Sequence, residues 1–414
     1  MGVGEQKYQV VDSCRVCKGH NLEIYLDLGN MPLVNSLEKP QGLKKDKFPL
    51  AVNFCHDCSL SQLTISVNPK ILFSDYPYRS SVSNEFGRHC DDLANELNEE
   101  KLQRGDLVVD LASNDGYLLE FFQKRGNKVL GIDPAKNLVE IANKKGIKTL
   151  EEFWNYETSQ KVLDEFGSPR LITAFNVFAH VPEIQSFTKG VKNLLGPNGY
   201  FIIESPHVQN LVENSEFDTI YHEHVSYLSA KAVKTLMDNN GLRIAKIKKF
   251  PIHGGSIRFY IEHAEGKDTS DGSLEKTLEE EEEKGIHSIK VYKEINKNAE
   301  KIKKDLVTLL KDLNGNSKKI CAFGASAKGN ILLNYCGLDN SLVDYVFDDT
   351  PEKQGFIFPG TKIPIVSRNN FEKIKPDYLI LLAWNFAKEL IKKTEDFRVN
   401  GGKYIIPIPQ VSIL

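Results

Sequence analysis

The sequence predicts an α/β protein with two Rossmann-like domains and a small N-terminal module held together by a metal ion. Residues 107–133 and residues 319–348 each read as a strand, a turn of small residues, a helix and a second strand, which is half of a doubly wound nucleotide fold. Two C-x-x-C pairs near the N-terminus predict the metal-binding module. Because 414 residues exceed one ordinary core, we expect three domains, at residues 1–83, 84–270 and 271–414.

The metal-binding module is predicted from two matched cysteine pairs, Cys14 with Cys17 and Cys55 with Cys58. Each pair can place two thiolates on one metal ion through a tight turn. Four sulfur ligands suit a tetrahedral zinc ion and leave no open position, so the site is predicted to be structural. A redox-active pair, or cysteines without a ligand, is the alternative interpretation. His56, inside the second pair, is expected to be exposed and not a ligand.

The cofactor site is predicted at the turn between the two strands of residues 107–133. The run 107–111 reads as a buried parallel strand, and the second run ends at Asp133. The turn between them offers a single glycine, Gly116, whereas the pyrophosphate of a dinucleotide requires close backbone approach at several glycines. The sequence therefore favours a nucleoside ligand without phosphates.

S-adenosylmethionine is such a ligand, and it assigns a task to the polar side chains at the turn and at the ends of the two strands. Asp133 would hold both ribose hydroxyls, while Asp110, Asn114 and Asp115 would face the methionine end. The alternative is a βαβ unit that binds nothing. The predicted cofactor-binding residues are Asp110, Ala112, Asn114, Asp115, Gly116, Asp133 and Asn176.

The rest of the chain continues to alternate between helical and strand-like runs. Helices are expected at 84–102, 137–146 and 187–199, and strands at 60–67, 147–150, 171–178, 200–206 and 258–262. Further along, a charged helical stretch at 273–314 precedes strands at 319–323, 343–348 and 379–384 and a helix at 330–338. The strand 171–178 leads to His180 at the carboxyl edge of the sheet, where ligands bind in such folds.

A dense group of acid–base side chains follows at Tyr221, His222, Glu223 and His224. Histidine and glutamate can exchange protons near neutral pH when burial or a partner shifts their pKa. The H-x-H pair and the carboxylate could also bind zinc or iron, although the spacing is not the helical H-E-x-x-H, and a structural role is a third interpretation. Acid–base catalysis is the favoured one.

Three polar segments are candidates for contact with a substrate. The aromatic loop at 73–83 offers hydroxyl groups, although packing is the alternative for its tyrosines. The glycine turn at 252–258 could position a substrate or could simply form a hairpin. The turn at 324–329 opens a helix and suits a phosphate group. The predicted substrate-binding residues are Tyr76, Tyr78, Ser80, His253, Arg258 and Lys328.

Seven motifs in one order carry a resemblance to a known family. They are the two C-x-x-C pairs, Tyr-x-Tyr-x-Ser-Ser-x-Ser at 76–83, ASNDGYLL at 112–119, NVFAHVP at 176–182, FDTIYHEH at 217–224, HGGSIR at 253–258 and GASAKG at 324–329. Together they resemble the sugar-nucleotide C-methyltransferase family, over nearly the whole chain. The resemblance implies a class I S-adenosylmethionine-dependent methyltransferase fold for the central domain. It also implies methyl transfer to a carbon beside the keto group of a nucleotide-linked 4-keto-deoxysugar, most commonly C3.

The chemistry that the resemblance implies fits the acid–base group. A C–H bond beside a carbonyl is weakly acidic, so a base must remove the proton while a donor holds the enolate oxygen. By resemblance, Tyr221, Glu223, His224 and His180 surround the sugar. We predict His224 as the base, oriented by Glu223 or His180, with Tyr221 donating to the enolate, although Tyr221 and His224 could exchange roles. Tyr78 would contact the sugar, and the C-terminal domain would help to hold the sugar nucleotide.

Composition narrows the remaining functional classes. A formal net charge of −3 gives no polybasic signature, so nucleic acid is not an expected partner. No apolar run is long enough to span a bilayer, and seven cysteines without a signal-peptide core indicate a cytoplasmic protein, which we expect to be monomeric. An NAD(P)-linked sugar-nucleotide oxidoreductase is the first alternative function, and the missing G-x-G-x-x-G counts against it. A non-catalytic zinc-ribbon scaffold is the second, and it leaves the acid–base group without a task.

Overall fold

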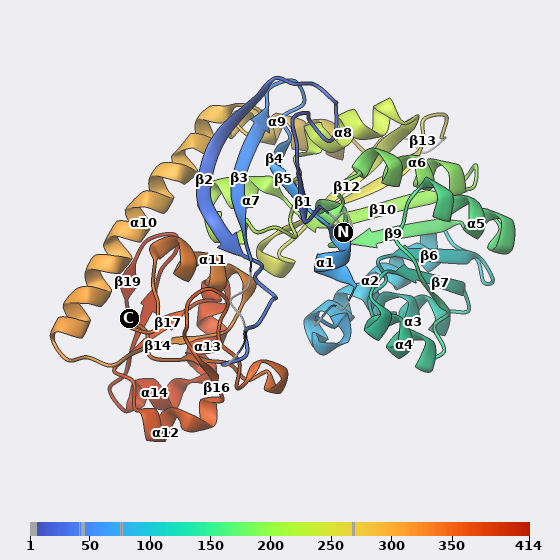
Figure 1. Ribbon diagram of the computed structural model, residues 1–414. Helices are drawn as coiled ribbons and strands as arrows, with labels where there is room; N and C mark the ends of the chain where they lie inside the picture. Colours follow the sequence, from blue (N-terminus) through green and yellow to red (C-terminus); the bar gives the residue numbers. More distant parts are fainter. Residues whose placement is uncertain (1–5, 41, 43–45, 75, 77, 267–269) are drawn as a thin grey trace, which may run out of the picture. The chain divides into compact units, whose positions relative to one another are not determined.

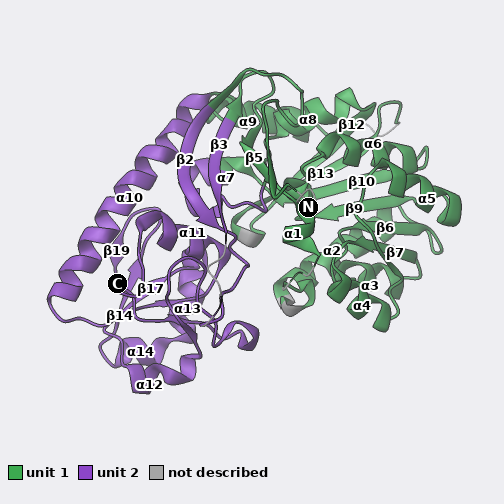
Figure 2. Cartoon of the chain, in the orientation of Figure 1, with its two compact units in different colours: residues 1–23, 54–209, 225–288 green, residues 24–53, 210–224, 289–414 purple. Residues whose placement is uncertain are grey.

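The computed structural model describes residues 6–40, 42, 46–74, 76, 78–266 and 270–414. These residues form two compact units, each assembled from segments that are distant in the sequence (Figure 2). Unit 1 comprises residues 1–23, 54–209 and 225–288, and unit 2 comprises residues 24–53, 210–224 and 289–414. The domain boundaries predicted from the sequence, 1–83, 84–270 and 271–414, divide the chain differently and stay predictions.

A seven-stranded sheet forms the centre of unit 1 (Figure 1). Its strand order is β12-β13-β10-β9-β6-β7-β8, and the five strands from β10 to β8 are parallel. β13 pairs antiparallel with both β10 and β12. The bounds are β6 Leu107–Leu111, β7 Lys128–Asp133, β8 Thr149–Glu151, β9 Leu171–Phe175, β10 Tyr200–Pro206, β12 Leu242–Phe250 and β13 Ser256–His263. The two strands predicted around the cofactor turn are therefore present.

Helices cover both faces of this sheet, as a parallel sheet requires. Successive strand residues such as Val108 and Val109 are buried in two different hydrophobic clusters, one on each face. The first cluster receives side chains from α2 Asn84–Glu100, α3 Tyr117–Lys124 and α4 Lys136–Lys144. The second receives them from α5 Tyr156–Phe166, α6 Ile184–Leu194 and α8 Ala230–Asn239. Cys90 of α2 is a buried core residue.

Short strands surround the N-terminal cysteines. β1 Tyr8–Val10 pairs with β5 Ile65–Val67, and β4 Ser61–Leu63 pairs with β11 Ser226–Tyr227. The single strand predicted at 60–67 is therefore wrong, because its two halves pair with different neighbours. β2 Leu22–Pro32 and β3 Lys47–Cys55 are adjacent strands. Further helices are α1 Pro69–Phe73, α7 Val208–Glu213 and α9 Ser273–Glu283.

A six-stranded sheet forms the centre of the C-terminal part of unit 2. Its order is β16-β15-β14-β17-β18-β19, and only the last pairing is antiparallel. The strands are β14 Ile320–Phe323, β15 Val346–Phe347, β16 Ile365–Val366, β17 Tyr378–Leu381, β18 Lys403–Ile406 and β19 Ser412–Ile413. The helices are α10 Ile289–Gly315, α11 Ala327–Cys336, α12 Phe371–Ile374, α13 Ala387–Lys393 and α14 Glu395–Val399. This second parallel sheet confirms the predicted α/β class.

Three predicted elements are shorter than expected. The strand predicted at 171–178 ends at Phe175, because Asn176 has a left-handed backbone with φ 56°. The strand predicted at 379–384 ends at Leu381, and a 3-10 turn begins at Trp384. The charged stretch 273–314 forms two helices, separated at a glycine, Gly285, whose φ is 72°.

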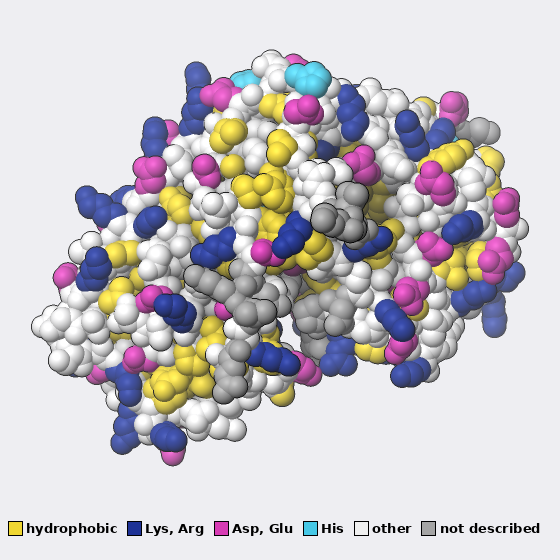
Figure 3. All heavy atoms as spheres, in the orientation of Figure 1, with side chains coloured by type: hydrophobic (Ala, Val, Ile, Leu, Met, Phe, Trp, Pro, Cys, Tyr) yellow, Lys and Arg dark blue, Asp and Glu magenta, His cyan; other side chains and the backbone are white. Residues whose placement is uncertain are grey.

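In the part of the chain that the structure describes, neither the visible surface (Figure 3) nor the helices show the features that nucleic-acid binding or a membrane span would need. On the face seen in Figure 3, basic and acidic side chains are interspersed, so this face carries no basic patch of the kind that binds nucleic acid. Within the described ranges, no helix is both long enough and apolar enough to cross a membrane.

Candidate active site

The four cysteines lie in two turns with the same backbone geometry. The amide of Lys18 donates to the Cys14 carbonyl oxygen at 2.9 Å, and the amide of Ser59 donates to the Cys55 carbonyl oxygen at 2.9 Å. Lys18 and Ser59 each lie four residues after the first cysteine of a pair, and both have left-handed backbones, with φ of 63° and 62°. The two sequence pairs therefore fold as two matched metal-binding knuckles.

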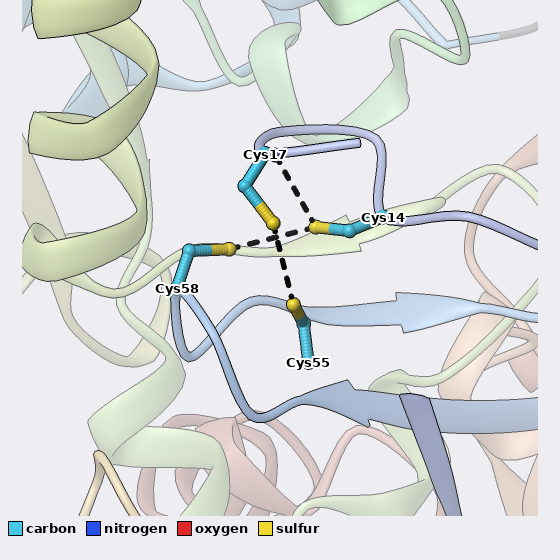
Figure 4. A group of neighbouring side chains, drawn as sticks. All are labelled: Cys14, Cys17, Cys55 and Cys58. Carbon is cyan, nitrogen blue, oxygen red and sulfur yellow. Dashed lines mark hydrogen bonds between the residues drawn. The ribbon is translucent and has the colours of Figure 1, made fainter. Parts of the chain in front are cut away.

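The four sulfur atoms point toward one another (Figure 4) and lie within 4.8 Å of each other. The Cys14–Cys58 and Cys17–Cys55 sulfur pairs are each 3.5 Å apart. A tetrahedral zinc ion with Zn–S bonds of about 2.3 Å needs sulfur separations of about 3.8 Å, so the set fits zinc. His56 is exposed, as predicted, and its Nε2 contacts Glu23 Oε2 at 3.0 Å.

The turn after β6 has the backbone of a glycine-rich loop although it contains one glycine. Ala112, Asn114 and Gly116 alternate in the left-handed region, with φ of 53°, 53° and 78°. Asparagine adopts this conformation more readily than most side chains, whereas alanine rarely does. Counting glycines alone does not predict this shape. The asparagine and the glycine at alternate positions, Asn114 and Gly116, were the signal for it.

Asp133, at the end of β7, ties the turn in place through both carboxylate oxygens. Oδ2 accepts from the Asn114 amide at 2.8 Å, and Oδ1 accepts from the Ala135 amide at 2.8 Å. Burial raises the pKa of Asp133, and the two hydrogen bonds lower it; the net result is a pKa of about 6. Each oxygen keeps a second lone pair, so the carboxylate can also accept from the ribose hydroxyls of a nucleoside.

Two further buried acids lie at this turn. Asp110 Oδ1 accepts from Thr173 Oγ1 at 2.6 Å, and burial raises the pKa of Asp110 to about 7. Asp115 Oδ2 is 3.1 Å from Lys145 Nζ, whereas Asp115 Oδ1 has no hydrogen-bond partner among the described residues. Three buried acids, one with an unsatisfied oxygen, fit a ligand that is both a nucleoside and a cation, as S-adenosylmethionine is.

The aromatic loop of unit 1 is attached to the cofactor turn through its backbone. Asn114 Oδ1 accepts from the Ser80 amide at 2.9 Å, and Asn114 Nδ2 donates to the Tyr78 carbonyl oxygen at 3.1 Å. Asn137, on α4, brackets Tyr76 in the same way, at 3.2 Å to its amide and 2.9 Å to its carbonyl oxygen. Tyr78 is 47% exposed, so its side chain is available to a ligand.

His180 and Asn176 follow β9 at the carboxyl edge of the sheet in unit 1. The His180 ring lies 6.0 Å from the ring of Phe73, which in turn lies 5.9 Å from the ring of Tyr76. The amide of Asn176 donates to the Glu204 carbonyl oxygen at 2.8 Å. The structure therefore gathers the predicted cofactor residues, the aromatic loop and His180 in one unit.

The predicted acid–base group lies in unit 2, after the 3-10 turn Phe217–Thr219. His224 Nδ1 is 3.0 Å from the Thr219 carbonyl oxygen, and His224 Nε2 is 2.8 Å from the Tyr221 hydroxyl. A carbonyl oxygen only accepts, so Nδ1 carries the proton and Nε2 presents its lone pair to the hydroxyl of Tyr221. The tautomer of His224 is thus fixed by its contacts.

Both members of this pair are neutral near pH 7. Burial lowers the pKa of His224 to about 4, and the positive charge of Lys328 lowers it further, against the Thr219 contact. Burial also raises the pKa of Tyr221 well above its usual value, with the charges of Glu223 and Asp218 adding to the rise. His224 can therefore accept a proton and Tyr221 can donate one.

The neighbouring residues of the group have other partners. Glu223 is buried and its Oε1 accepts from Asn35 Nδ2 at 2.6 Å. His222 Nε2 donates to the Pro49 carbonyl oxygen at 3.2 Å, and its ring meets Phe48 edge-on at 5.8 Å. Among the described residues, the cysteines are the group of three or more side chains whose ligand atoms lie close enough to share a metal ion, and the H-x-H pair with Glu223 does not form such a group.

The turn after β14 in unit 2 repeats the arrangement at Asp133. Asp348 follows β15, and its Oδ2 accepts from the Ala325 amide at 2.6 Å while its Oδ1 accepts from the Thr350 amide at 2.8 Å. Lys353 Nζ donates to the Ala325 carbonyl oxygen at 2.8 Å. Lys328, at the start of α11, lies 4.7 Å from the ring centroid of Trp384. Unit 2 therefore carries a turn that Asp348 holds with the same pattern of hydrogen bonds as Asp133.

Arg258 lies inside the sheet of unit 1 and is 2% exposed. Its Nε donates to Glu204 Oε2 at 2.6 Å, and Glu204 also contacts His89 Nε2 at 2.7 Å. This pairing ties β13 to β10, so a contact between Arg258 and substrate stays a prediction. The side chain of His253 lies outside the described part of the structure.

Sequence reasoning missed four residues that shape the site: Asn137, Lys145, Thr219 and Asp348. Asp348 was findable, because it ends the second strand of a βαβ unit as Asp133 does. Thr219 acts through its backbone, and Asn137 and Lys145 act across the fold. No pattern along the chain signals those contacts.

The fold, the cofactor turn and the cysteine cluster define an S-adenosylmethionine-dependent methyltransferase with a structural zinc site. Residues 82–247 match the family model of a methyltransferase domain, and residues 14–73 match that of a zinc binding domain. Residues 251–409 match the model of a C-methyltransferase C-terminal domain.

Similarity to a C-methyltransferase assigns the chain to a family within the methyltransferases. The chain is 35% identical over 409 residues to the C-methyltransferase NovU of Streptomyces niveus, over 98% of this chain and 97% of that protein. The chain belongs to the C-methyltransferase family. It is an enzyme that uses S-adenosylmethionine, which sets aside the oxidoreductase and scaffold alternatives.

Solved methyltransferase structures resemble part of the chain. The magnesium protoporphyrin IX methyltransferase ChlM of Synechocystis PCC 6803, with bound SAM, is 15% identical, with a TM-score of 0.33 over 42% of this chain and 78% of that one. An S-adenosylmethionine-dependent methyltransferase of Clostridium acetobutylicum ATCC 824 is 17% identical, with a TM-score of 0.35 over 43% of this chain and 91% of that one.

Proposed function

We propose that this enzyme methylates a carbon beside the keto group of a nucleotide-linked 4-keto-deoxysugar. The observation that carries the proposal is the Tyr221–His224 pair. A methyltransferase that acts on oxygen or nitrogen can use a lone pair of its acceptor, whereas carbon beside a ketone must first lose a proton. A neutral, half-buried histidine with a fixed tautomer, in contact with a tyrosine hydroxyl, supplies both a base and a donor.

The proposed reaction uses His224 and Tyr221 in turn. His224 Nε2 accepts the proton of the C–H bond, and the electron pair of that bond moves toward the ketone oxygen to give an enolate. The Tyr221 hydroxyl turns from Nε2 to donate to the enolate oxygen. Bound S-adenosylmethionine supplies the electrophilic methyl group. The Thr219 carbonyl keeps Nδ1 protonated throughout, so the base stays at Nε2.

The nucleotide part of the proposal is supported by the turn at Asp348. It repeats the contacts of Asp133, the residue that we propose for the ribose of the cofactor. The N-terminus of α11 follows directly, and Lys328 adds a positive charge there, as a diphosphate requires. A sugar nucleotide has both a ribose and a diphosphate, so this turn suits it better than a free sugar.

The position of the ketone limits the acceptor carbon to two candidates. A ketone at C4 acidifies the C–H bonds at both C3 and C5. We expect C3, because it is the commonest acceptor in the family that the sequence resembles, and the structure of the product decides between the two carbons.

The proposal is tested by mass spectrometry after incubation with S-adenosylmethionine and dTDP-4-keto-6-deoxyglucose. We expect one added methyl group, and none with dTDP-glucose, which has no ketone. His224→Asn keeps a donor toward Thr219 but removes the base, and should lower kcat by about 100-fold or more. The matched control is His222→Gln, which keeps a donor toward Pro49 and should retain activity. Equal methylation of dTDP-glucose, or full activity in His224→Asn, would overturn the proposal.

A further inference from the structure

Asp218 is a buried carboxylate in the 3-10 turn that leads to the acid–base pair, and one of its oxygens is unsatisfied. Its side chain is 0% exposed. Oδ2 accepts from Trp384 Nε1 at 2.7 Å, whereas Oδ1 has no hydrogen-bond partner among the residues that the structure describes. Buried polar atoms are almost always hydrogen-bonded, so this oxygen indicates a missing partner.

Asp218 is close to the reacting groups of unit 2. It directly precedes Thr219, whose carbonyl oxygen holds His224 Nδ1. Its negative charge contributes to the raised pKa of Tyr221. Burial raises the pKa of Asp218 itself, against the charge of Lys328, the Trp384 hydrogen bond and the backbone amides of Asp218 and Thr219, which lower it. Asp218 is thus one residue from the carbonyl that holds His224, and its charge acts on Tyr221.

The neighbouring acid Glu216 does not combine complete burial with an unsatisfied carboxylate oxygen. Its Oε1 accepts from Asn214 Nδ2 at 3.2 Å, and it also interacts with Lys328. Two carboxylates thus lie on one turn near the same lysine, and only Asp218 combines complete burial with an unsatisfied oxygen.

We propose that Asp218 Oδ1 accepts a hydrogen bond from a ring hydroxyl of the bound sugar, and so selects acceptors that carry a free hydroxyl near the reacting carbon. The inference rests on the proposed function, because it takes the acceptor to be a keto sugar. A carboxylate oxygen needs a donor, and hydroxyls are the donors that a sugar offers. An acceptor without that hydroxyl would leave the buried carboxylate unpaired, and sites of this kind reject such analogues strongly.

The test compares dTDP-4-keto-6-deoxyglucose with its 2-deoxy and 3-deoxy analogues. Wild-type enzyme should show a kcat/KM roughly 10- to 100-fold higher for the fully hydroxylated sugar than for one of the analogues, as expected for a hydrogen bond to a charged group. Asp218→Asn and Asp218→Ala should lose most of that preference by losing activity on the hydroxylated sugar. Glu216→Gln, which removes the neighbouring charge, should keep the preference.

Several outcomes separate this inference from the proposed function. If wild-type enzyme methylates all three sugars equally, or if both Asp218 variants keep its preference, the missing partner is a water molecule and the inference is wrong. If wild-type enzyme methylates none of the three, the proposed function has failed instead. Each variant is shown to be folded by its binding of S-adenosylhomocysteine, which uses residues of unit 1. The comparison of the three sugars with wild-type enzyme tests the inference even if a variant does not fold.

Discussion

His224 is held by two contacts that leave one nitrogen ready for a proton. Its reactive form is neutral, and its pKa of about 4 lies below the value of about 6.5 for a free histidine. A lowered pKa keeps the base neutral until the pH falls through the lowered value. We therefore expect the kcat/KM for the sugar nucleotide, measured with saturating S-adenosylmethionine, to be constant near neutral pH and to decline only as the pH falls through about 4.

Lys328 provides a test of this electrostatic argument. Its positive charge lowers the pKa of His224, so Lys328→Met should raise that pKa and move the acidic limb of the kcat/KM profile to higher pH. Lys303→Met is the control, because Lys303 lies over the ring of Tyr335 in the same unit at 4.6 Å. An acidic limb that stays in place in Lys328→Met, or moves equally in both variants, would contradict the argument.

Asp133 permits a second prediction for a single residue. Asp133→Ala should weaken S-adenosylhomocysteine binding by about 10-fold or more in isothermal titration, because hydrogen bonds to a charged group are lost. The pKa of Asp133 is raised to about 6, so its charge is lost as the pH falls through that value and wild-type affinity should weaken below it. Asp164→Asn, an exposed change on α5, is the control. Unchanged affinity in Asp133→Ala would remove this residue from the cofactor site.

At the scale of elements, the aromatic loop depends on two asparagines. Asn137→Ala removes both of the hydrogen bonds to Tyr76 and leaves those from Asn114 to Tyr78 and Ser80. We expect the KM for the sugar nucleotide to rise about tenfold, which corresponds to two ordinary hydrogen bonds, while cofactor affinity stays within about twofold. Steady-state kinetics with a parallel titration of S-adenosylhomocysteine separates the two effects. Equal losses in both would show that Asn137 supports the cofactor and not the loop.

The predicted elements that the structure confirms are those determined by a local sequence pattern. A short continuous apolar run predicted the strand at 107–111, and the matched cysteine spacing predicted the two knuckles. The boundaries that failed depend on other parts of the chain. The run 60–67 divides because its halves pair with β11 and β1, and no residue within the run signals that change.

In the candidate site, too, the features set by local sequence pattern were predictable and those set by distant contacts were not. Asp133 was identified because it ends a strand, and Tyr221 and His224 because they cluster in sequence. The fixed tautomer of His224 depends on a backbone carbonyl, and the unsatisfied oxygen of Asp218 depends on burial, so neither could be read from residue identity. The structure adds the Thr219 carbonyl oxygen as a partner of His224 Nδ1, and the orienting role expected for Glu223 or His180 stays a prediction.

At the scale of the whole molecule, the zinc site belongs to the core of unit 1. Cys14, Cys55 and Cys58 are buried in the same hydrophobic cluster as strands β6, β7 and β9. β4, three residues after the second knuckle, pairs with β11, the segment that follows His224 in the chain. Loss of zinc should therefore loosen unit 1 as a unit and not only its N-terminal turns.

This expectation is tested by thermal unfolding before and after zinc removal by a chelator. We expect a lower Tm and a parallel loss of S-adenosylhomocysteine binding, with recovery of both when zinc is restored. Cys55→Ser should reproduce the loss, whereas Cys321→Ser, at a buried cysteine outside the cluster, should retain zinc. Zinc-free protein that melts and binds the cofactor normally would show that the cluster is independent of the core.

We assign binding of S-adenosylmethionine to residues of unit 1. We assign the base, the hydroxyl that donates to the enolate and the carboxylate that accepts from the sugar hydroxyl to residues of unit 2. If the enzyme acts as proposed, the new bond joins methyl to carbon. Carbon NMR of the product formed from S-adenosylmethionine with a ¹³C-labelled methyl group and dTDP-4-keto-6-deoxyglucose measures this bond. We predict the label in a methyl group bonded to a ring carbon beside C4. A label bonded to oxygen, or found on no sugar nucleotide, would contradict the proposed reaction.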